Sequence, residues 1–300
     1  MSDIELRRAA FAWLGEQTDV HGQVLSRELL GNGFLYKGER IPLVSPQGIF
    51  KPRQMELPLS ITTVADGPYQ DAFGPSLLRY RYRGSDPNHR DNAGLRELIR
   101  RREPLIYFHA LVKGKYLAVW PVFVVGDEPA ALTFSVAVDD ALALKAGVDL
   151  AATAEDVVAD IRRGYITATV RRRIHQAAFR ERVIDAYRQQ CALCCLKHDE
   201  LLDAAHILPD ADPDGEPVVP NGIALCKLHH AAFDRFFLSV RPDYMIEIRE
   251  DVLHETDGPM LKHGLQGMHL QRIQLPTRMA LRPSPDLLGQ RHRRFLELAR

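Results

Sequence analysis

The sequence predicts an α+β protein in which a mixed helical and β-rich amino-terminal part precedes a smaller carboxy-terminal module. Three observations support this. Runs of β-branched and aromatic residues separated by turn residues fill 49–138, apolar residues at helical spacing precede and follow them, and all four cysteines lie within 191–226. Because 300 residues suit two domains, we expect an amino-terminal domain at 1–150, a basic linker or helix at 151–180 and a carboxy-terminal domain at 181–300.

Helices are expected at both ends of the chain and strands in its first half. Within residues 1–30, apolar residues such as Leu6, Ala10 and Leu14 recur at helical spacing and predict a first helix. Ser26 is placed to begin a second helix. The predicted strands are Ile49–Phe50, Leu57–Val64, Leu78–Tyr82, Leu105–Leu111, Tyr116–Val125 and Leu132–Val138, with a helix at Asp91–Arg102, a hairpin turn at Gly114 and a last basic helix at Asp286–Arg300. The opening pattern fits a winged-helix element and the helical start of an α+β domain equally well. The last helix suits packing on the core or on a second subunit.

Four residues with zinc-ligand spacing form two pairs. Two residues separate Cys191 from Cys194, and two separate Cys226 from His229. Each pair can supply two ligands from a tight turn or a helix start, so the two pairs together can hold one tetrahedral Zn²⁺. Cys195 is an alternative to Cys194, although the two-residue spacer is the commoner one. Because the chain shows no hydrophobic signal segment, we expect a reducing, cytoplasmic location and thiols rather than disulfides. The alternative is a set of buried cysteines beside a surface histidine.

A second set of ligands has harder donor atoms. His230 and Asp234 stand four residues apart in a segment without glycine or proline, so a helix there presents both on one face. An imidazole and a carboxylate with open positions suit hydrated Mg²⁺ or Mn²⁺, which polarises a phosphate oxygen. His206 is the natural general base, because a neutral imidazole accepts a proton from water at ambient pH. For His206 alone, a hydrogen-bonded core histidine is the alternative.

Around these residues, over about 180–245, the chain resembles the HNH nucleases, whose ββα-metal fold is a hairpin packed on a helix. The resemblance rests on Asn-Gly-Ile-Ala-Leu-Cys-Lys-Leu-His-His-Ala-Ala-Phe-Asp. It implies that His206 activates water, that Asn221 positions this histidine or binds metal, and that His230 binds the catalytic cation. The structural zinc clip found in one branch of the family corresponds to Cys191, Cys194, Cys226 and His229.

The chain departs from the HNH pattern at one position. Many members carry an Asp or His ligand immediately before the first His, where this chain has Ala205. The third ligand of a cation held by His230 and Asp234 is therefore open between Asp203, the side-chain carbonyl of Asn221, and water with substrate phosphate. The segment Asp210–Pro220 contains three prolines and a glycine and is predicted to be the solvated loop of the hairpin.

Arginines are concentrated before the cysteine pairs. Residues 161–190 hold eight arginines against two acidic residues, although the net charge of the whole chain is zero. Such a cluster suits contact with phosphates. Arg180 has acidic neighbours and fits a solvated helix face equally well. The triplet Arg171, Arg172 and Arg173 has no such neighbours and is predicted to contact DNA.

A second candidate DNA-binding segment interleaves cations with aromatic residues. Its sequence is Arg-Tyr-Arg-Tyr-Arg-Gly, and such a mixture suits phosphate and base contacts. The candidate residues are Arg79, Arg81, Tyr82 and Arg83. The alternative is a strand with tyrosines pointing inward and arginines outward.

The order of the parts resembles the McrA-like, modification-dependent restriction nucleases. Residues 41–52 are similar to front-domain segments of restriction HNH proteins. The resemblance implies a metal-dependent endonuclease that cuts double-stranded DNA containing methylated cytosine, with the front domain choosing the target. Cutting both strands suits a homodimer or a transient pair on DNA, and no membrane span is predicted.

Two other functions fit parts of the sequence. A catalytically weak or inactive zinc-containing nucleic-acid-binding protein would account for Ala205, whereas intact His206, Asn221 and His230 favour an enzyme. A zinc protein that serves as an interaction adaptor would show no affinity for duplex DNA.

Overall fold

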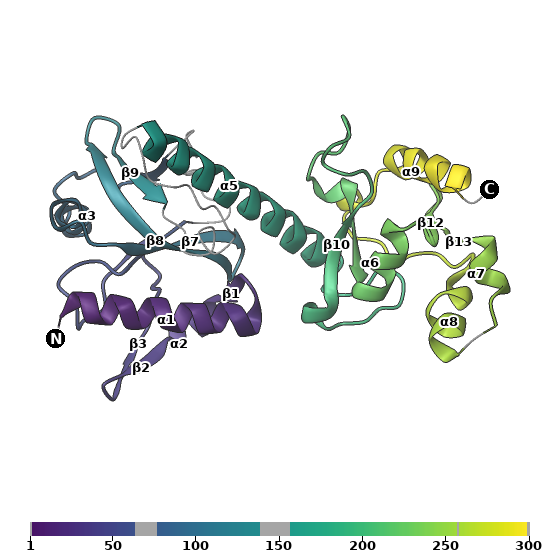
Figure 1. Cartoon of the computed structure of the whole chain (residues 1–300), viewed down its shortest axis with the longest axis horizontal. Coiled ribbons are helices and arrows are strands. Elements are labelled where there is room, and N and C mark those ends of the chain that lie inside the picture. Colours follow the sequence, from purple (N-terminus) through teal and green to yellow (C-terminus); the bar gives the residue numbers. More distant parts are fainter. Residues whose placement is uncertain (1, 64–76, 139–156, 257, 299–300) are drawn as a thin grey trace. The chain divides into compact units, whose positions relative to one another are not determined.

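A computed structural model describes residues 2–63, 77–138, 157–256 and 258–298. The chain forms two compact units, Met1–Ala177 and Ala178–Arg300, and the boundary falls within helix α5 (Val157–Ala186) (Figure 1). None of the helices in the described ranges combines the length and the apolar character that crossing a membrane requires.

The amino-terminal unit is built on a seven-stranded sheet with the order β4-β5-β7-β8-β9-β6, in which β1 also pairs with β8. The strands are β1 (Val24–Ser26), β4 (Ile49–Phe50), β5 (Ser60–Thr62), β6 (Leu78–Arg81), β7 (Leu105–Val112), β8 (Lys115–Glu128) and β9 (Thr133–Val138). Strands β5 and β7 run parallel, and the other pairs in this sheet are antiparallel. Gly114 turns the chain between β7 and β8 at φ 81°, which confirms the predicted hairpin.

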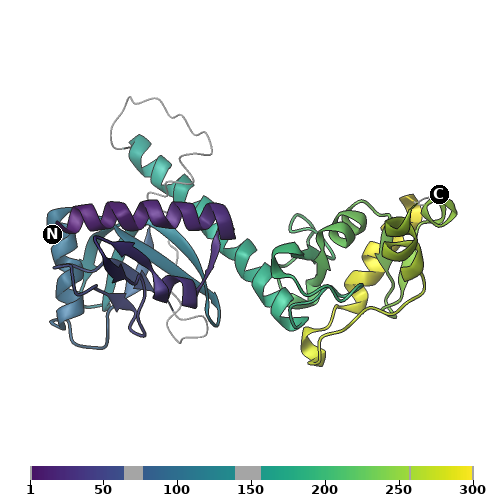
Figure 2. The same ribbon diagram turned by 90° about the horizontal axis from the view of Figure 1, so that it is seen from below.

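Helix α1 (Asp3–His21) packs on this sheet, as Figure 2 shows for the purple helix. Leu6, Ala10 and Leu14 repeat every four residues, and all three belong to one buried cluster with Phe108 and Trp120 of the sheet. The chain therefore begins as the helical start of an α+β domain. Helix α2 (Arg27–Asn32) begins after Ser26, whose hydroxyl accepts the amide of Leu29 at 3.1 Å, as predicted. The hairpin of β2 (Phe34–Tyr36) and β3 (Glu39–Ile41) follows.

One predicted strand is shorter than expected. Only Ser60–Thr62 of the segment Leu57–Val64 forms β5, and Val64 lies outside the described residues. Pro58 has no amide hydrogen to give to a strand ladder. The Leu57 amide donates instead to the Asp3 carboxylate at 3.0 Å. The predicted helix after β6 is α3 (Arg90–Arg101).

The carboxy-terminal unit begins as a hairpin followed by a helix. Strands β10 (Leu202–His206) and β11 (Gly222–Cys226) pair antiparallel, with Leu202 opposite Cys226 and His206 opposite Gly222, and α6 (Lys227–Asp234) follows directly. The remaining elements are β12 (Leu238–Val240), β13 (Ile246–Ile248), α7 (Glu250–His254), α8 (Pro259–Gly264) and α9 (Pro285–Leu298). This is the ββα arrangement that the sequence predicted.

Two helices from outside the hairpin complete its core. A Cβ atom at Gly222 would lie 2.5 Å from Val183 and 2.9 Å from Phe179, so α5 approaches β11 as closely as only glycine permits. Helix α9 places Leu288 in the same buried cluster. The predicted last helix therefore packs on the core of its own unit, and the final two residues of the prediction, 299–300, lie outside the described chain.

Candidate active site and metal centre

Four zinc-type ligands meet where the hairpin passes into helix α6. The Nδ1 atom of His229 lies 3.4 Å from the sulfur of Cys191 and 3.2 Å from that of Cys226, and the sulfur of Cys194 lies 3.9 Å from that of Cys226. All four ligand atoms lie within 4.8 Å of one another. Cys195 is exposed and outside this group.

This cluster fits a structural Zn²⁺ ion. Three thiols and one imidazole are a tetrahedral zinc set, and no position is left for a substrate. The other ring nitrogen of His229, Nε2, lies 2.7 Å from the carbonyl oxygen of Gly264 at the end of α8. That contact selects the tautomer in which Nδ1 is free to bind the metal. The sequence spacing did not point to Gly264, because its contact depends on the packing of α8.

His206 ends strand β10 and lies against an aromatic wall. Its ring stacks on Phe179 of α5 with centroids 4.0 Å apart and planes 16° apart. Its Nε2 atom lies 3.1 Å from an Asp210 carboxylate oxygen. Both neighbours were missed at the sequence level. The i,i+4 spacing of Asp210 was a usable signal, whereas Phe179 is brought in only by tertiary packing.

His230 projects from α6 between two carboxylates. Its Nδ1 lies 3.4 Å from an Asp203 oxygen and its Nε2 lies 3.2 Å from an Asp234 oxygen. The two carboxylates thus stand at opposite nitrogens of one ring. Asp203 is also contacted by Lys227 at 3.2 Å and by Arg180 at 3.7 Å. Asp203 therefore has Lys227 and Arg180 as cationic partners besides His230, whereas Asp234 is the more exposed of the two carboxylates.

His230 and Asp234 place an imidazole nitrogen and a carboxylate oxygen 3.2 Å apart, which are donor types that a divalent cation can use. An imidazole nitrogen with an adjacent carboxylate is a set that Mg²⁺ or Mn²⁺ accepts, with water and phosphate oxygens completing the shell. Asp234 is more than half exposed and therefore accessible to a hydrated ion.

Helix α6 packs on strand β10, so the charged groups of α6 act on the His206 ring at the end of that strand. Burial lowers the pKa of His206, Asp210 opposes this shift, and the charges of His230 and Asp234 also act on the ring. The hydrogen bonds to Asp203 and Asp234 raise the pKa of His230 to about 9. Burial alone would raise the pKa of Asp203, but the hydrogen bond from His230 and the charge of Lys227 outweigh it and keep the pKa below its usual range.

Asn221 is buried immediately before β11 and holds the hairpin loop closed. Its side-chain oxygen accepts the Leu208 amide at 2.9 Å, and its Nδ2 donates to the carbonyl oxygens of Leu208 at 2.9 Å and Glu216 at 3.0 Å. Every polar atom of this side chain thus has a backbone partner. The geometry supports a residue that positions the segment after His206.

The candidate DNA-binding residues of β6 have different environments. The strand alternates, with Leu78 and Tyr80 buried and Arg79 and Arg81 exposed. Tyr82, just after it, is 7% exposed, and its hydroxyl bonds to Asp127 and accepts from Arg96. Arg83 donates to Gln47 at 2.9 Å and pairs with Asp91. Arg79 and Arg81 are therefore the two of the four that face outward from the strand.

The arginine triplet lies within α5. Arg171 and Arg172 are exposed, and Arg173 is half-buried. The Nε of Arg173 donates to Gln23 at 3.1 Å. Two of the three side chains thus stand at the surface of the helix.

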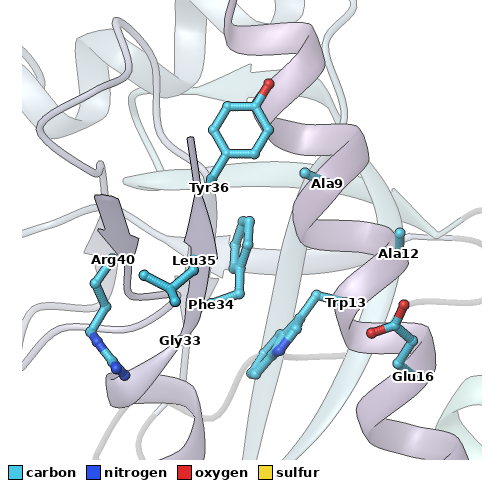
Figure 3. A pocket seen from close by; sticks show the side chains of 9 residues that line it. All are labelled: Ala9, Ala12, Trp13, Glu16, Gly33, Phe34, Leu35, Tyr36 and Arg40. Carbon is cyan, nitrogen blue, oxygen red and sulfur yellow. The ribbon is translucent and has the colours of Figure 1, made fainter. Parts of the chain in front are cut away.

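A groove of about 530 Å³ lies between α1 and the β2–β3 hairpin (Figure 3). Its lining consists of Ala9, Ala12, Trp13, Glu16, Gly33, Phe34, Leu35, Tyr36 and Arg40. The rings of Trp13 and Phe34 stack with centroids 5.9 Å apart. None of the site residues predicted from the sequence lines this groove.

Comparison with protein families gives one match, to the HNH endonucleases over residues 191–241. The matched segment contains both ligand sets and the hairpin with its helix. No curated protein matches the sequence. Among solved structures, the chain is similar to "Modification dependent TagI restriction endonuclease", with 15% identity, a TM-score of 0.31 and coverage of 79% of this chain and 81% of that chain. The family match confirms the HNH resemblance predicted from the residues.

Proposed function

Because its carboxy-terminal unit carries an HNH endonuclease module, we propose that this chain cuts DNA by metal-dependent hydrolysis with His206 as the general base. In this proposal His230 and Asp234 hold Mg²⁺ or Mn²⁺, and Cys191, Cys194, Cys226 and His229 hold a Zn²⁺ ion that only stabilises the fold. We also propose a cytoplasmic location, because thiols that bind zinc must stay reduced and the cytoplasm is a reducing compartment.

The placement of the two histidines is the observation that carries the proposal: His206 lies against Phe179 at the end of β10, and His230 lies between two carboxylates on α6, the helix that packs on β10. Burial lowers the pKa of His206, and two carboxylates raise that of His230 to about 9. A neutral imidazole is the form that accepts a proton. Groups whose pKa values are driven apart within one site are suited to different chemical roles.

The chain's own residues perform the proton transfer. Phe179 holds the His206 ring by stacking, and Asp210 stands 3.1 Å from Nε2, where it stabilises the imidazolium that forms when water loses its proton. Asn221 fixes the backbone that follows His206. A divalent ion bound by His230 and Asp234 would supply Lewis-acid stabilisation of charge on the phosphate and on the leaving 3′ oxygen.

Target choice is assigned to the amino-terminal unit. Arg171 and Arg172, with Arg79 and Arg81, are exposed cations suited to phosphate oxygens. Recognition of methylated cytosine follows from the resemblance to McrA-like nucleases. Cutting both strands would need two active sites, so the proposal includes a homodimer or a transient pair on DNA.

Plasmid nicking with Mg²⁺ or Mn²⁺ tests the proposal. His206→Ala is expected to lower the cleavage rate by roughly 10²- to 10⁴-fold, because it removes a general base, while zinc content stays unchanged. His198→Ala, which alters an exposed histidine near the zinc ligands, is the matched control and should cut like the native chain.

Two outcomes would contradict the proposal. Equal cutting by His206→Ala and the native chain would remove His206 from the mechanism. Duplex binding without any cation-dependent cutting by the native chain would favour the inactive nucleic-acid-binding alternative. Digestion of plasmids with and without methylated cytosine separately tests the modification requirement.

A further inference from the structure

Arg291 on helix α9 is a charged residue in an apolar place. It lies fifty residues beyond the end of the segment that matches the HNH family. Its side chain is only 5% exposed. Burying a guanidinium is costly unless its donors find acceptors, so its contacts show what the residue holds in place.

The guanidinium joins the two halves of the active site. One Nη atom donates to the carbonyl oxygen of Ile207 at 3.2 Å, and the other donates to that of Phe233. Ile207 directly follows His206, and Phe233 directly precedes Asp234. One rigid, planar group thus connects the backbone beside the general base to the backbone beside the proposed cation ligand.

Aromatic rings fix the plane of this group. The guanidinium carbon lies 3.8 Å from the ring centroid of Phe233 and 4.5 Å from that of Phe236. Burial lowers the pKa of Arg291 to about 10, and Asp234 opposes the shift, so the side chain is still a cation at neutral pH. Desolvated cation–π contacts of this kind are stronger than exposed ones.

Stability alone does not account for an arginine here. Its Nε atom is buried without an acceptor among the described protein atoms. Taking a guanidinium out of water carries a large desolvation penalty even after relaxation, so an arginine is an unfavourable residue for packing alone at this position. A residue that is suboptimal for stability and touches both sides of a site is better explained by what it positions.

We propose that Arg291 is a positioning residue that holds His206 and Asp234 at a fixed separation, and that α9 is thereby a working part of the nuclease. The inference rests on the proposed function, and it concerns a residue outside the family match. Arg291 acts through the backbone at Ile207 and Phe233 and touches no reacting atom.

Single-turnover and steady-state cleavage of plasmid DNA by the full chain tests the inference. Arg291→Met keeps the length of the side chain and removes its donors. It should lower kcat by about 10- to 100-fold while KM and DNA affinity stay within twofold, because misplaced catalytic groups affect chemistry more than binding. Arg291→Lys, which keeps the charge and can still reach one carbonyl, should recover part of the loss. Arg293→Met, an exposed arginine on the same helix, should retain native kcat.

A readout that needs no activity separates this inference from the proposed function. In Arg291→Met, hydrogen exchange at residues 207–221 and 233–236 should be faster than in the native chain and in Arg293→Met. If the native chain shows no nuclease activity but hydrogen exchange is still faster in Arg291→Met, the proposed function is wrong and the positioning role of Arg291 is retained. Native exchange and native kcat in Arg291→Met would overturn the positioning role. Loss of zinc and of folding in both Arg291 variants would overturn it too, since the residue would then serve stability alone.

Discussion

His206 and His230 carry the same ring, and their surroundings shift its pKa in opposite directions. His206 lies against Phe179, and burial favours the neutral form. His230 lies between Asp203 and Asp234, and its pKa rises to about 9. At neutral pH one ring is therefore ready to accept a proton, while in the proposed mechanism the other would have to release one before binding a cation.

The pH dependence of cleavage should report the environment of His206. Since burial lowers its pKa, the ring stays neutral to a pH below its usual value of 6.5, and kcat should rise with pH through that lowered pKa and then level off. Phe179→Leu removes the stacked ring and lets water approach. The inflection should then move up toward 6.5.

The measurement is a pH–rate profile at saturating DNA and saturating cation, for the native chain and for Phe179→Leu. His198→Ala serves again as a control that leaves the inflection in place. An inflection that does not move in Phe179→Leu would show that the stacked ring does not set the pKa of the base.

In the amino-terminal unit, a third histidine couples pH to the free energy of unfolding. His109 lies on β7 with Nδ1 2.7 Å from the Tyr107 hydroxyl, and burial lowers its pKa from 6.5 to about 4. A lowered pKa means that the unfolded chain takes up the proton first, so stability is full above pH 6.5 and falls as the pH drops toward 4. The difference corresponds to roughly 3 kcal/mol of unfolding free energy at most.

Tryptophan fluorescence can follow this unit alone, because the only two tryptophans of the chain are Trp13 and Trp120. Urea unfolding at pH 7.5 and pH 5 should show the loss in the native chain and a smaller loss in His109→Gln. His21→Gln, at the exposed end of α1, should behave like the native chain. An equal loss in His109→Gln would assign the effect to other groups.

At the scale of elements, a zinc ion in the Cys3His cluster would fasten strand β11 and helix α6 to each other, and His229 connects this cluster to helix α8. His229 belongs to α6, Cys226 ends β11, and Gly264 ends α8. A metal bound by ligands from several short elements contributes directly to their folding. Removal of this ion should therefore unfold the hairpin and its helix together.

Two treatments distinguish the metals. A strong zinc chelator, or Cys226→Ser, should abolish cleavage. Either treatment should also remove the part of the far-UV circular dichroism signal that comes from the secondary structure of the carboxy-terminal unit. Removing Mg²⁺ or Mn²⁺ alone should abolish cleavage and leave the fold and the bound zinc unchanged. Folded, zinc-free protein after strong chelation would contradict the structural role of the clip.

The sequence predicted those parts of the site that depend on spacing along the chain. Two-residue spacers hold Cys191 beside Cys194 and Cys226 beside His229. The two pairs meet because the backbone next to Cys191 bonds to strand β11 through the amide of Ala192 and the carbonyl oxygen of Ala224. Phe179 and Arg291 could not be predicted in the same way, because helices remote in sequence bring them to His206 and Asp234. Strand β5 is shorter than predicted for a local reason, because Pro58 has no amide hydrogen to donate. The prediction followed the β-branched residues of this segment and gave too little weight to the proline.

At the scale of the whole molecule, the chain has zero net charge, so DNA affinity must come from local clusters of cations. Arg171 and Arg172 are exposed on α5, while Arg173 bonds to Gln23. Each phosphate contact releases a counterion and adds about 0.9 to the slope of log affinity against log salt for duplex DNA. Changing the two exposed arginines should therefore reduce that slope by about 2.

Phosphate contacts carry no sequence information, so the same change should leave discrimination intact. Arg171→Ala combined with Arg172→Ala should weaken binding to methylated and unmodified duplexes by the same factor, as measured by fluorescence anisotropy over a range of salt concentrations. Arg8→Ala, an exposed arginine on α1, is the control and should retain the native slope. A native slope in the double variant would remove α5 from the DNA contact. A change in the ratio of the affinities for methylated and unmodified duplex would mean that α5 takes part in recognising the modification. The proposal gives this recognition to the amino-terminal unit as a whole.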